Sequence, residues 1–247
     1  MFTRLLVGLD GSPRSDAAFE QALLLARRFG ATVVAAYVRE SGKPDEDGHM
    51  LERAGERAAE VAAPFEAVEK DGEPDLALAE LAHGSDAVLV GRRGVATTDD
   101  ALGPTVASLI RIAQTSVIVC GGTPSPMKQC AVAYDGRATA KRALELAARF
   151  ATTGESTVHV IHAAADRDAG LRVVGEAEAA LSMLRVPFVT HLETGKPGEV
   201  VARVIARTKC DALFAGAHVP RERTSLASAS HAEEILRTTD IPVVIQP

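Results

Sequence analysis

The sequence predicts an α/β protein made of two tandem doubly wound domains, each built on a five-stranded parallel sheet. Short runs rich in valine and alanine alternate with stretches of helical periodicity along the whole chain. Such alternation is typical of a parallel sheet with helices on both faces. The same pattern then starts again near the middle of the chain, which indicates an internal duplication.

The first half contains five strand-like and four helix-like stretches. Strands are expected at 5–9, 32–38, 65–68, 87–90 and 117–119, and helices at 13–29, 51–62, 75–82 and 106–113. Ser12 followed by Pro13 predicts the start of the first helix, because the serine oxygen can cap free N–H groups and proline suits the first helical position. Gly30 predicts its end.

Four landmarks of the first half recur in the second. Asp135-Gly136 repeats Asp10-Gly11, Gly195 repeats Gly72, Gly216 repeats Gly91, and Arg237 repeats Arg111, at intervals of 123 to 126 residues. Between the copies lies a run of turn formers, Gly121-Gly-Thr-Pro-Ser-Pro126. We therefore expect domains at 1–121 and 128–247, joined by a linker at 122–127.

Composition narrows the range of partners. The net charge is −6 and the chain has no basic tract, so neither nucleic acid nor an anionic membrane is an expected partner. No apolar run approaches the roughly 18 residues of a membrane span. Three cysteines without paired spacing indicate reduced thiols. A disulfide between Cys120 and Cys130 is conceivable, but reduced thiols are the expectation. Together these observations predict a soluble cytoplasmic protein.

These residues resemble the universal stress protein family in its tandem, two-domain form, over nearly the whole chain. The features that carry the resemblance are Asp10-Gly11-Ser12 at a strand end, Gly72-x-Pro74, the glycine loop after the fourth strand, and Arg111-x-Ala113 leading into the last strand. The resemblance implies an adenine nucleotide alpha hydrolase-like, Rossmann-like fold. It also implies a cytoplasmic stress-response protein that binds ATP as a structural or signalling ligand.

The nucleotide motif of the family reads Gly, two residues, Gly, nine residues, then Gly-Ser or Gly-Thr. Gly91 and Gly94 match its first two glycines. Nine residues further lies Pro104-Thr105, and Gly103 takes the place of the third glycine if the loop is one residue shorter. Small residues let the backbone approach phosphates, and the following helix N-terminus offers N–H donors. Simple loop geometry without a ligand is the competing interpretation.

Three further residues are carried over from the family to the first site. Asp10 and Ser12 end the first strand, where the family's aspartate lies near the adenine and ribose, and Val38 occupies the second-strand position whose backbone contacts adenine. Asp10 could equally close a turn. Asp99 and Asp100 would repel a triphosphate unless Mg²⁺ screened them, although they are more typical of a solvated loop tip than of a metal site.

The second copy keeps the spacing of the motif but has lost most of its glycines. Val219 and Ala229 replace the second and third glycine, and a β-branched valine is costly where φ must be positive. Two arginines of the loop nevertheless suit phosphate. The weaker second candidate site is Asp135, Gly216, Arg221, Arg223 and Ser230.

No convincing catalytic or metal-binding arrangement emerges. Walker A, Gly-x-Gly-x-x-Gly and Gly-x-Ser-x-Gly motifs are absent, so any ATP hydrolysis is expected to be slow and incidental. His159 and His162 point to opposite faces of one strand, which argues against a metal there. The alternative function is a tandem scaffold that no longer binds nucleotide and acts through protein contacts. The strands at 117–119 and 243–245 could pair within the chain as a pseudo-dimer, and a further homodimer is possible.

Overall fold

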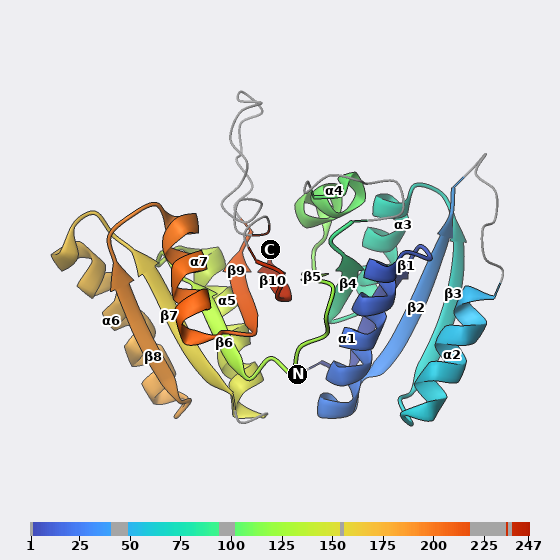
Figure 1. Cartoon of the computed structure of the whole chain (residues 1–247), viewed down its shortest axis with the longest axis horizontal. Coiled ribbons are helices and arrows are strands. Elements are labelled where there is room, and N and C mark those ends of the chain that lie inside the picture. Colours follow the sequence, from blue (N-terminus) through green and yellow to red (C-terminus); the bar gives the residue numbers. More distant parts are fainter. Residues whose placement is uncertain (1, 41–48, 94–101, 154–155, 218–235, 237–238) are drawn as a thin grey trace. The chain divides into compact units, whose positions relative to one another are not determined.

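A computed structural model describes residues 2–40, 49–93, 102–153, 156–217, 236 and 239–247. The chain divides into two compact units, Met1–Ser125 and Pro126–Pro247 (Figure 1). The division lies inside residues 122–127, the segment that the sequence predicts to be a linker.

The first unit contains a five-stranded parallel sheet in the order β3-β2-β1-β4-β5. Helices α1 and α2 lie on the same side of strands β1 to β3 (Figure 1), and α3 packs against α4 and β2. Its elements are β1 Arg4–Leu9, α1 Pro13–Phe29, β2 Thr32–Arg39, α2 Met50–Glu60, β3 Phe65–Asp71, α3 Pro74–Leu81, the 3-10 turn η1 Ala82–Gly84, β4 Ala87–Gly91, α4 Pro104–Ile112 and β5 Ser116–Cys120.

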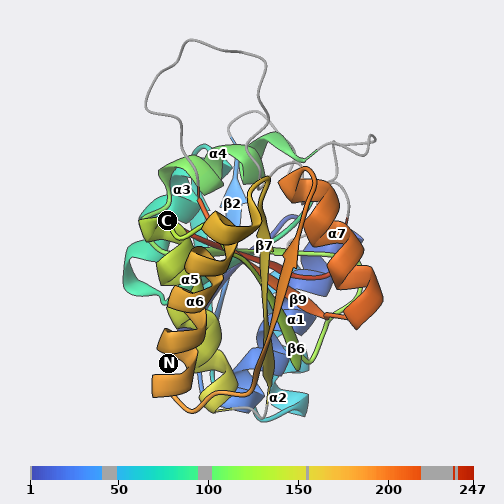
Figure 2. The same ribbon diagram turned by 90° about the vertical axis from the view of Figure 1, so that its left-hand side faces the viewer.

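The second unit repeats this sheet in the order β10-β9-β6-β7-β8, again with parallel strands. Helices α5 and α6 lie on one side of the strands and α7 on the other (Figure 2). Its elements are β6 Gln129–Ala133, α5 Ala138–Thr152, β7 Thr157–Ala163, α6 Arg167–Met183, β8 Phe188–Glu193, α7 Pro197–Thr208, β9 Ala212–Gly216 and β10 Val243–Gln246. The predicted fold class is confirmed.

Signals at helix ends explain most of the boundaries. The Ser12 hydroxyl accepts a hydrogen bond from the Ser15 N–H (3.1 Å) and caps α1, and Gly30 ends that helix with φ of 68°. Both were expected. Helix α4 instead begins at Pro104, two residues before the predicted start at Val106. The apolar periodicity begins only at Val106, whereas the fixed φ of proline already suits the first helical position.

The central strands are fully buried, as their continuous apolar runs require in a sheet covered on both faces. Every residue from Ala87 to Val90 is buried, as is every residue from Ala212 to Ala215. All three cysteines are buried and free. Within the described ranges, no helix is long and apolar enough to cross a membrane.

Candidate functional site

The strand order of the first unit has a topological switch point between β1 and β4. From β1 the chain proceeds to β2 and β3 on one side, and β4 and β5 lie on the other. The two strands are parallel, with Val7 opposite Leu89, so Asp10 and Arg92 follow neighbouring strand ends on the same edge of the sheet. In open α/β sheets, ligands bind in the crevice outside this edge at the switch point.

Asp10 closes the turn that leads into α1. Its Oδ1 accepts hydrogen bonds from the Ser12 N–H (3.0 Å) and from the Ser12 hydroxyl (2.6 Å), and Gly11 between them has φ of 76°. Ser12 is only 5% exposed, whereas Asp10 is exposed. Ser12 is therefore occupied with shaping the turn and capping the helix, and the carboxylate of Asp10 is the member of the pair that faces solvent.

Gly91 ends β4 at a point where the backbone of α1 passes very close. A Cβ atom built on Gly91 would lie 2.7 Å from the carbonyl carbon of Arg14 and 2.8 Å from its oxygen. Such distances exclude any side chain unless the helix shifts. The fold itself thus requires this glycine, whether or not a ligand approaches it.

Backbone hydrogen bonds of Arg92 join the end of β4 to β5 and to the start of α4. Arg92 donates its N–H to the Cys120 carbonyl (3.1 Å) and accepts from the Gly103 N–H (3.1 Å). This second bond holds the N-terminus of α4 beside the end of β4. Gly103 is the N-cap, with φ of −59° and no side-chain cap, and Pro104 and Thr105 open the helix. The first-turn N–H groups of a helix and its dipole favour an anion there.

The structure brings most of the predicted first site to one edge of the sheet. Asp10 follows β1, Gly91 ends β4, and Gly103 precedes α4. Val38 is the half-buried penultimate residue of β2, the strand next to β1. Gly94 lies outside the described residues, as do Asp99 and Asp100.

The second unit reproduces the turn but not its cap. Asp135 Oδ1 accepts from the Arg137 N–H (3.0 Å), and Gly136 has φ of 78°. Arg137 stands where the first copy has Ser12, and its guanidinium pairs with the Asp135 carboxylate (3.5 Å). The aspartate of the second copy is therefore partly neutralised by a neighbour that the first copy lacks.

Gly216 is required by the fold for the same reason as Gly91. Its added Cβ would lie 2.6 Å from the carbonyl carbon of Thr139, which occupies the place of Arg14. Ala217 donates to the Gln246 carbonyl (2.7 Å), as Arg92 does to Cys120. Arg221, Arg223 and Ser230, the other members of the weaker candidate site, lie outside the described residues.

The prediction from the sequence missed three features of the two units. Aligning the copies at the 125-residue interval would have shown Arg137 at the position of Ser12. The close approach of α1 and α5 to the strand-end glycines depends on three-dimensional packing. The third feature is a pairing of His159 with His191, which lie 32 residues apart on neighbouring strands. Among the residues that the structure describes, no three His, Cys, Asp or Glu side chains gather to hold a metal ion.

Comparison with known proteins gives consistent similarities. A family model described as the universal stress protein family matches residues 1–121 and 171–247. A curated universal stress protein of Synechocystis sp. (strain ATCC 27184 / PCC 6803 / Kazusa) is 26% identical over 172 residues, which are 68% of this chain. The matched region spans only 60% of the length of that relative.

Two solved structures resemble the chain over nearly its whole length. A universal stress protein from Archaeoglobus fulgidus DSM 4304 has a TM-score of 0.77 at 20% identity, covering 98% of this chain and 97% of its own. A functionally unknown protein from Pseudomonas aeruginosa PAO1 has a TM-score of 0.76 at 16% identity, covering 99% of this chain and 92% of its own. At these identities the likeness concerns the fold.

Proposed function

The chain belongs to the universal stress protein family, and we propose that its first unit binds an adenine nucleotide, ATP in particular, as a structural or signalling ligand in a stress response. The observation that carries this proposal is the geometry of the switch point in the first unit. There the exposed Asp10 carboxylate, the end of β4 and the N-terminus of α4 lie at one edge of the sheet.

Each part of this edge suits one part of a nucleotide. The bond between Arg92 and Gly103 fixes the N-terminus of α4 at the strand end, where its N–H groups and dipole would favour a phosphate. Pro104 at the first helical position removes only a donor that the helix itself does not use. Asp10 and the backbone near Val38 lie on the adjoining strands, where the family holds adenine and ribose. Mg²⁺ would screen the triphosphate from Asp99 and Asp100.

The second unit is the weaker candidate. Arg137 already pairs with the Asp135 carboxylate, so this group is less available to a ribose hydroxyl. The glycine that the second copy keeps, Gly216, is one that helix packing demands. The presence of Gly216 in the second copy is therefore not evidence that this unit binds a ligand. We propose that nucleotide binding has been kept in the first unit and weakened in the second.

Titration calorimetry with ATP and MgCl₂ on the full chain tests this proposal. Asp10→Ala and Asp135→Ala are matched variants, because each removes the carboxylate that accepts an N–H two residues further on. We expect heat of binding for the unchanged chain, a weakened affinity for Asp10→Ala, and an unchanged affinity for Asp135→Ala. The absence of heat at millimolar ATP would reject the proposal, and the reverse order of the two variants would move the site to the second unit.

The alternative is a tandem scaffold that acts through protein contacts without nucleotide. It is favoured by the structural roles of Gly91 and Ser12, which explain both residues without a ligand. Release of co-purified nucleotide on denaturation, read by chromatography, would separate the two functions. If the first unit binds ATP, we propose no enzymatic role beyond slow, incidental ATP hydrolysis, and turnover well above background that disappears in Asp10→Ala would contradict this.

A further inference from the structure

The second unit contains a network of four hydrogen-bonded side chains across one face of its sheet. His159 on β7 lies with its Nδ1 3.1 Å from Nε2 of His191 on β8. His159 Nε2 lies 2.9 Å from Oε1 of Gln129 on β6, and His191 Nδ1 lies 3.5 Å from Nη2 of Arg207 on α7. The ring planes differ by 14° and the centroids are 5.4 Å apart, farther than the nitrogens, so the rings meet edge to edge.

The direction of every hydrogen bond in this network follows from Arg207 at one end of it. A guanidinium can only donate, so Nδ1 of His191 accepts and its Nε2 carries the hydrogen when the ring is neutral. That Nε2–H donates to Nδ1 of His159, whose own Nε2–H then donates to the Gln129 carbonyl oxygen. All contacts are satisfied together when both imidazoles are neutral.

An additional proton on either ring breaks this order. On His191 it would occupy Nδ1 and face the N–H of Arg207, and on His159 it would occupy Nδ1 and face the Nε2–H of His191. Each case opposes two donors, and a proton on His191 also adds positive charge beside the Arg207 guanidinium. Burial lowers the pKa of both imidazoles; His191 lowers that of His159 further, and Arg207 that of His191.

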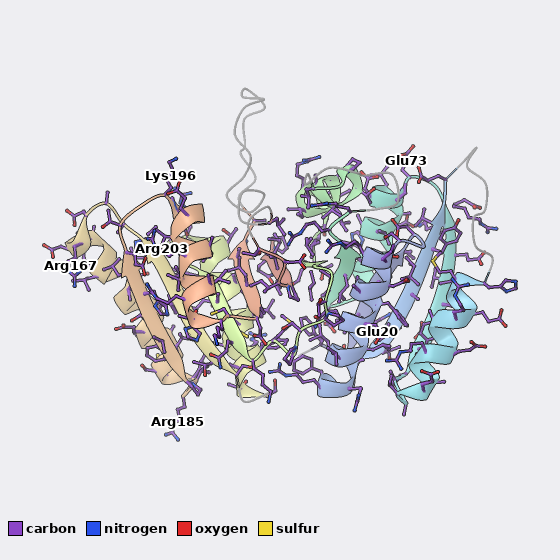
Figure 3. All side chains as sticks on the ribbon, viewed as in Figure 1. Glu20, Glu73, Arg167, Arg185, Lys196 and Arg203 are labelled. Carbon is purple, nitrogen blue, oxygen red and sulfur yellow. The ribbon has the colours of Figure 1, made fainter. Side chains whose placement is uncertain are left out.

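The other charges near the pair do not offset an added proton. Glu193 on β8 raises the pKa of His191, but burial and Arg207 outweigh it. Its carboxylate already pairs with Arg207 (2.7 Å) and with Arg203 (2.7 Å) on α7, a residue labelled in Figure 3. Among the residues that the structure describes, no further Cys, Asp or Glu joins the two histidines into a metal-binding group.

We propose that His159 and His191 form an acid-sensitive latch that holds the edge strand β8 to β7 while both are neutral and releases it on acidification. Because both folded pKa values lie below the unfolded value of about 6.5, the stabilisation is fully present above that pH and is lost as the pH falls below it. The latch belongs to the second unit and does not depend on nucleotide binding.

The first unit provides a built-in control. Buried Val34 stands at the position of His159. Arg4, at the position of Gln129, makes a bidentate ion pair with Glu66 on β3 (2.6 and 2.7 Å). Arginine and glutamate do not titrate between pH 5.5 and 7.5 in ordinary surroundings. The hydrogen bonds between them raise the pKa of Arg4 and lower that of Glu66, against the opposite effect of burial. Strands β2 and β3 should therefore not respond to pH in this range.

Hydrogen exchange of the full chain, followed by mass spectrometry at pH 7.5 and 5.5 and corrected for intrinsic rates, tests the latch. We expect the β8 peptide to lose protection at pH 5.5 while the β3 peptide keeps it. In the double variant His159→Gln/His191→Gln, which has no titrating group at these positions, protection of β8 should not depend on pH. His162→Gln, on the same strand but bonded to the Tyr134 carbonyl, should respond like the unchanged chain.

Equal protection of β8 at the two pH values in the unchanged chain would overturn the proposal. The same loss of protection in the double variant would overturn it too. If the double variant does not fold, NMR titration of the unchanged chain replaces it. His159 and His191 must then titrate below the unfolded value of about 6.5, together with the loss of protection in β8, or the latch is rejected.

Discussion

At the scale of single residues, Gly91 and Gly216 separate what the fold requires from what a ligand requires. Both end a strand, and a Cβ on either would lie within 2.7 Å of a helix backbone, that of α1 for Gly91 and that of α5 for Gly216. Gly91 is also the first glycine of the family's nucleotide motif. The glycine that the diverged copy keeps is therefore the one that helix packing requires, and both units share this helix–strand contact.

Replacing either glycine by alanine should destabilise its unit to a similar degree. Forcing an additional methyl group into a packed contact costs about 1–3 kcal/mol, and the contacts of Gly91 with Arg14 and of Gly216 with Thr139 are nearly equal in distance. Urea unfolding of the full chain, followed by circular dichroism, measures both variants. If Gly91→Ala were as stable as the unchanged chain but no longer bound ATP, Gly91 would serve the ligand instead of the helix.

At the scale of elements, one aspartate ties the start of β4 to the start of β1. Oδ2 of Asp86 accepts from the Thr3 N–H (2.5 Å), the Thr3 hydroxyl (2.8 Å) and the Arg4 N–H (2.9 Å). Asp211 does the same in the second unit, accepting from the N–H groups of Lys128 and Gln129. These bonds fix the register of two neighbouring strands at the edge opposite the candidate site.

Asp86 should make the first unit sensitive to acid. Burial acts to raise the pKa of Asp86, but the hydrogen bonds from Thr3 and Arg4 outweigh it and hold the pKa below its ordinary value. The stabilisation is thus present above the unfolded value of about 3.9 and is lost as the pH falls through the folded value. Asp86→Ala should cost about 1 kcal/mol at pH 7.

Urea unfolding at pH 7 and pH 3 measures this effect. The difference between Asp86→Ala and the unchanged chain should shrink at pH 3, because the unchanged carboxyl is then increasingly protonated. A difference that stayed constant between the two pH values would show that Asp86 contributes through packing and not through its charge.

The elements were predictable from the sequence because their signals are local. Continuous apolar runs marked the buried strands, and Ser12-Pro13 and Gly30 marked the ends of α1. The candidate site was predictable only as a motif and a fold position. The approach of Arg14 to Gly91 depends on how a helix crosses a sheet, and the pairing of His159 with His191 depends on the register of two strands. Neither has a counterpart in residue spacing.

At the scale of the whole molecule, one fold has been used twice and its copies have diverged in different chemistry. The first unit keeps an exposed aspartate and a helix N-terminus at its switch point. The second has an arginine beside its aspartate and a titratable histidine pair on its sheet. A ligand and a pH change between 7.5 and 5.5 should therefore act on different units of one chain.

Scanning calorimetry of the full chain at pH 7.5 would test this division for the ligand. If only the first unit binds ATP, saturating ATP and MgCl₂ should raise the temperature of one unfolding transition and leave that of the other unchanged. The reason is that a ligand at 100 times its Kd stabilises the unit that binds it by about 2.7 kcal/mol. Gly91→Ala and Gly216→Ala assign the transitions, because each should lower that of its own unit. A shift of both transitions would mean that both units bind ATP or that they unfold together, and Asp10→Ala and Asp135→Ala distinguish these cases. No shift at all would leave the scaffold as the better account of the molecule.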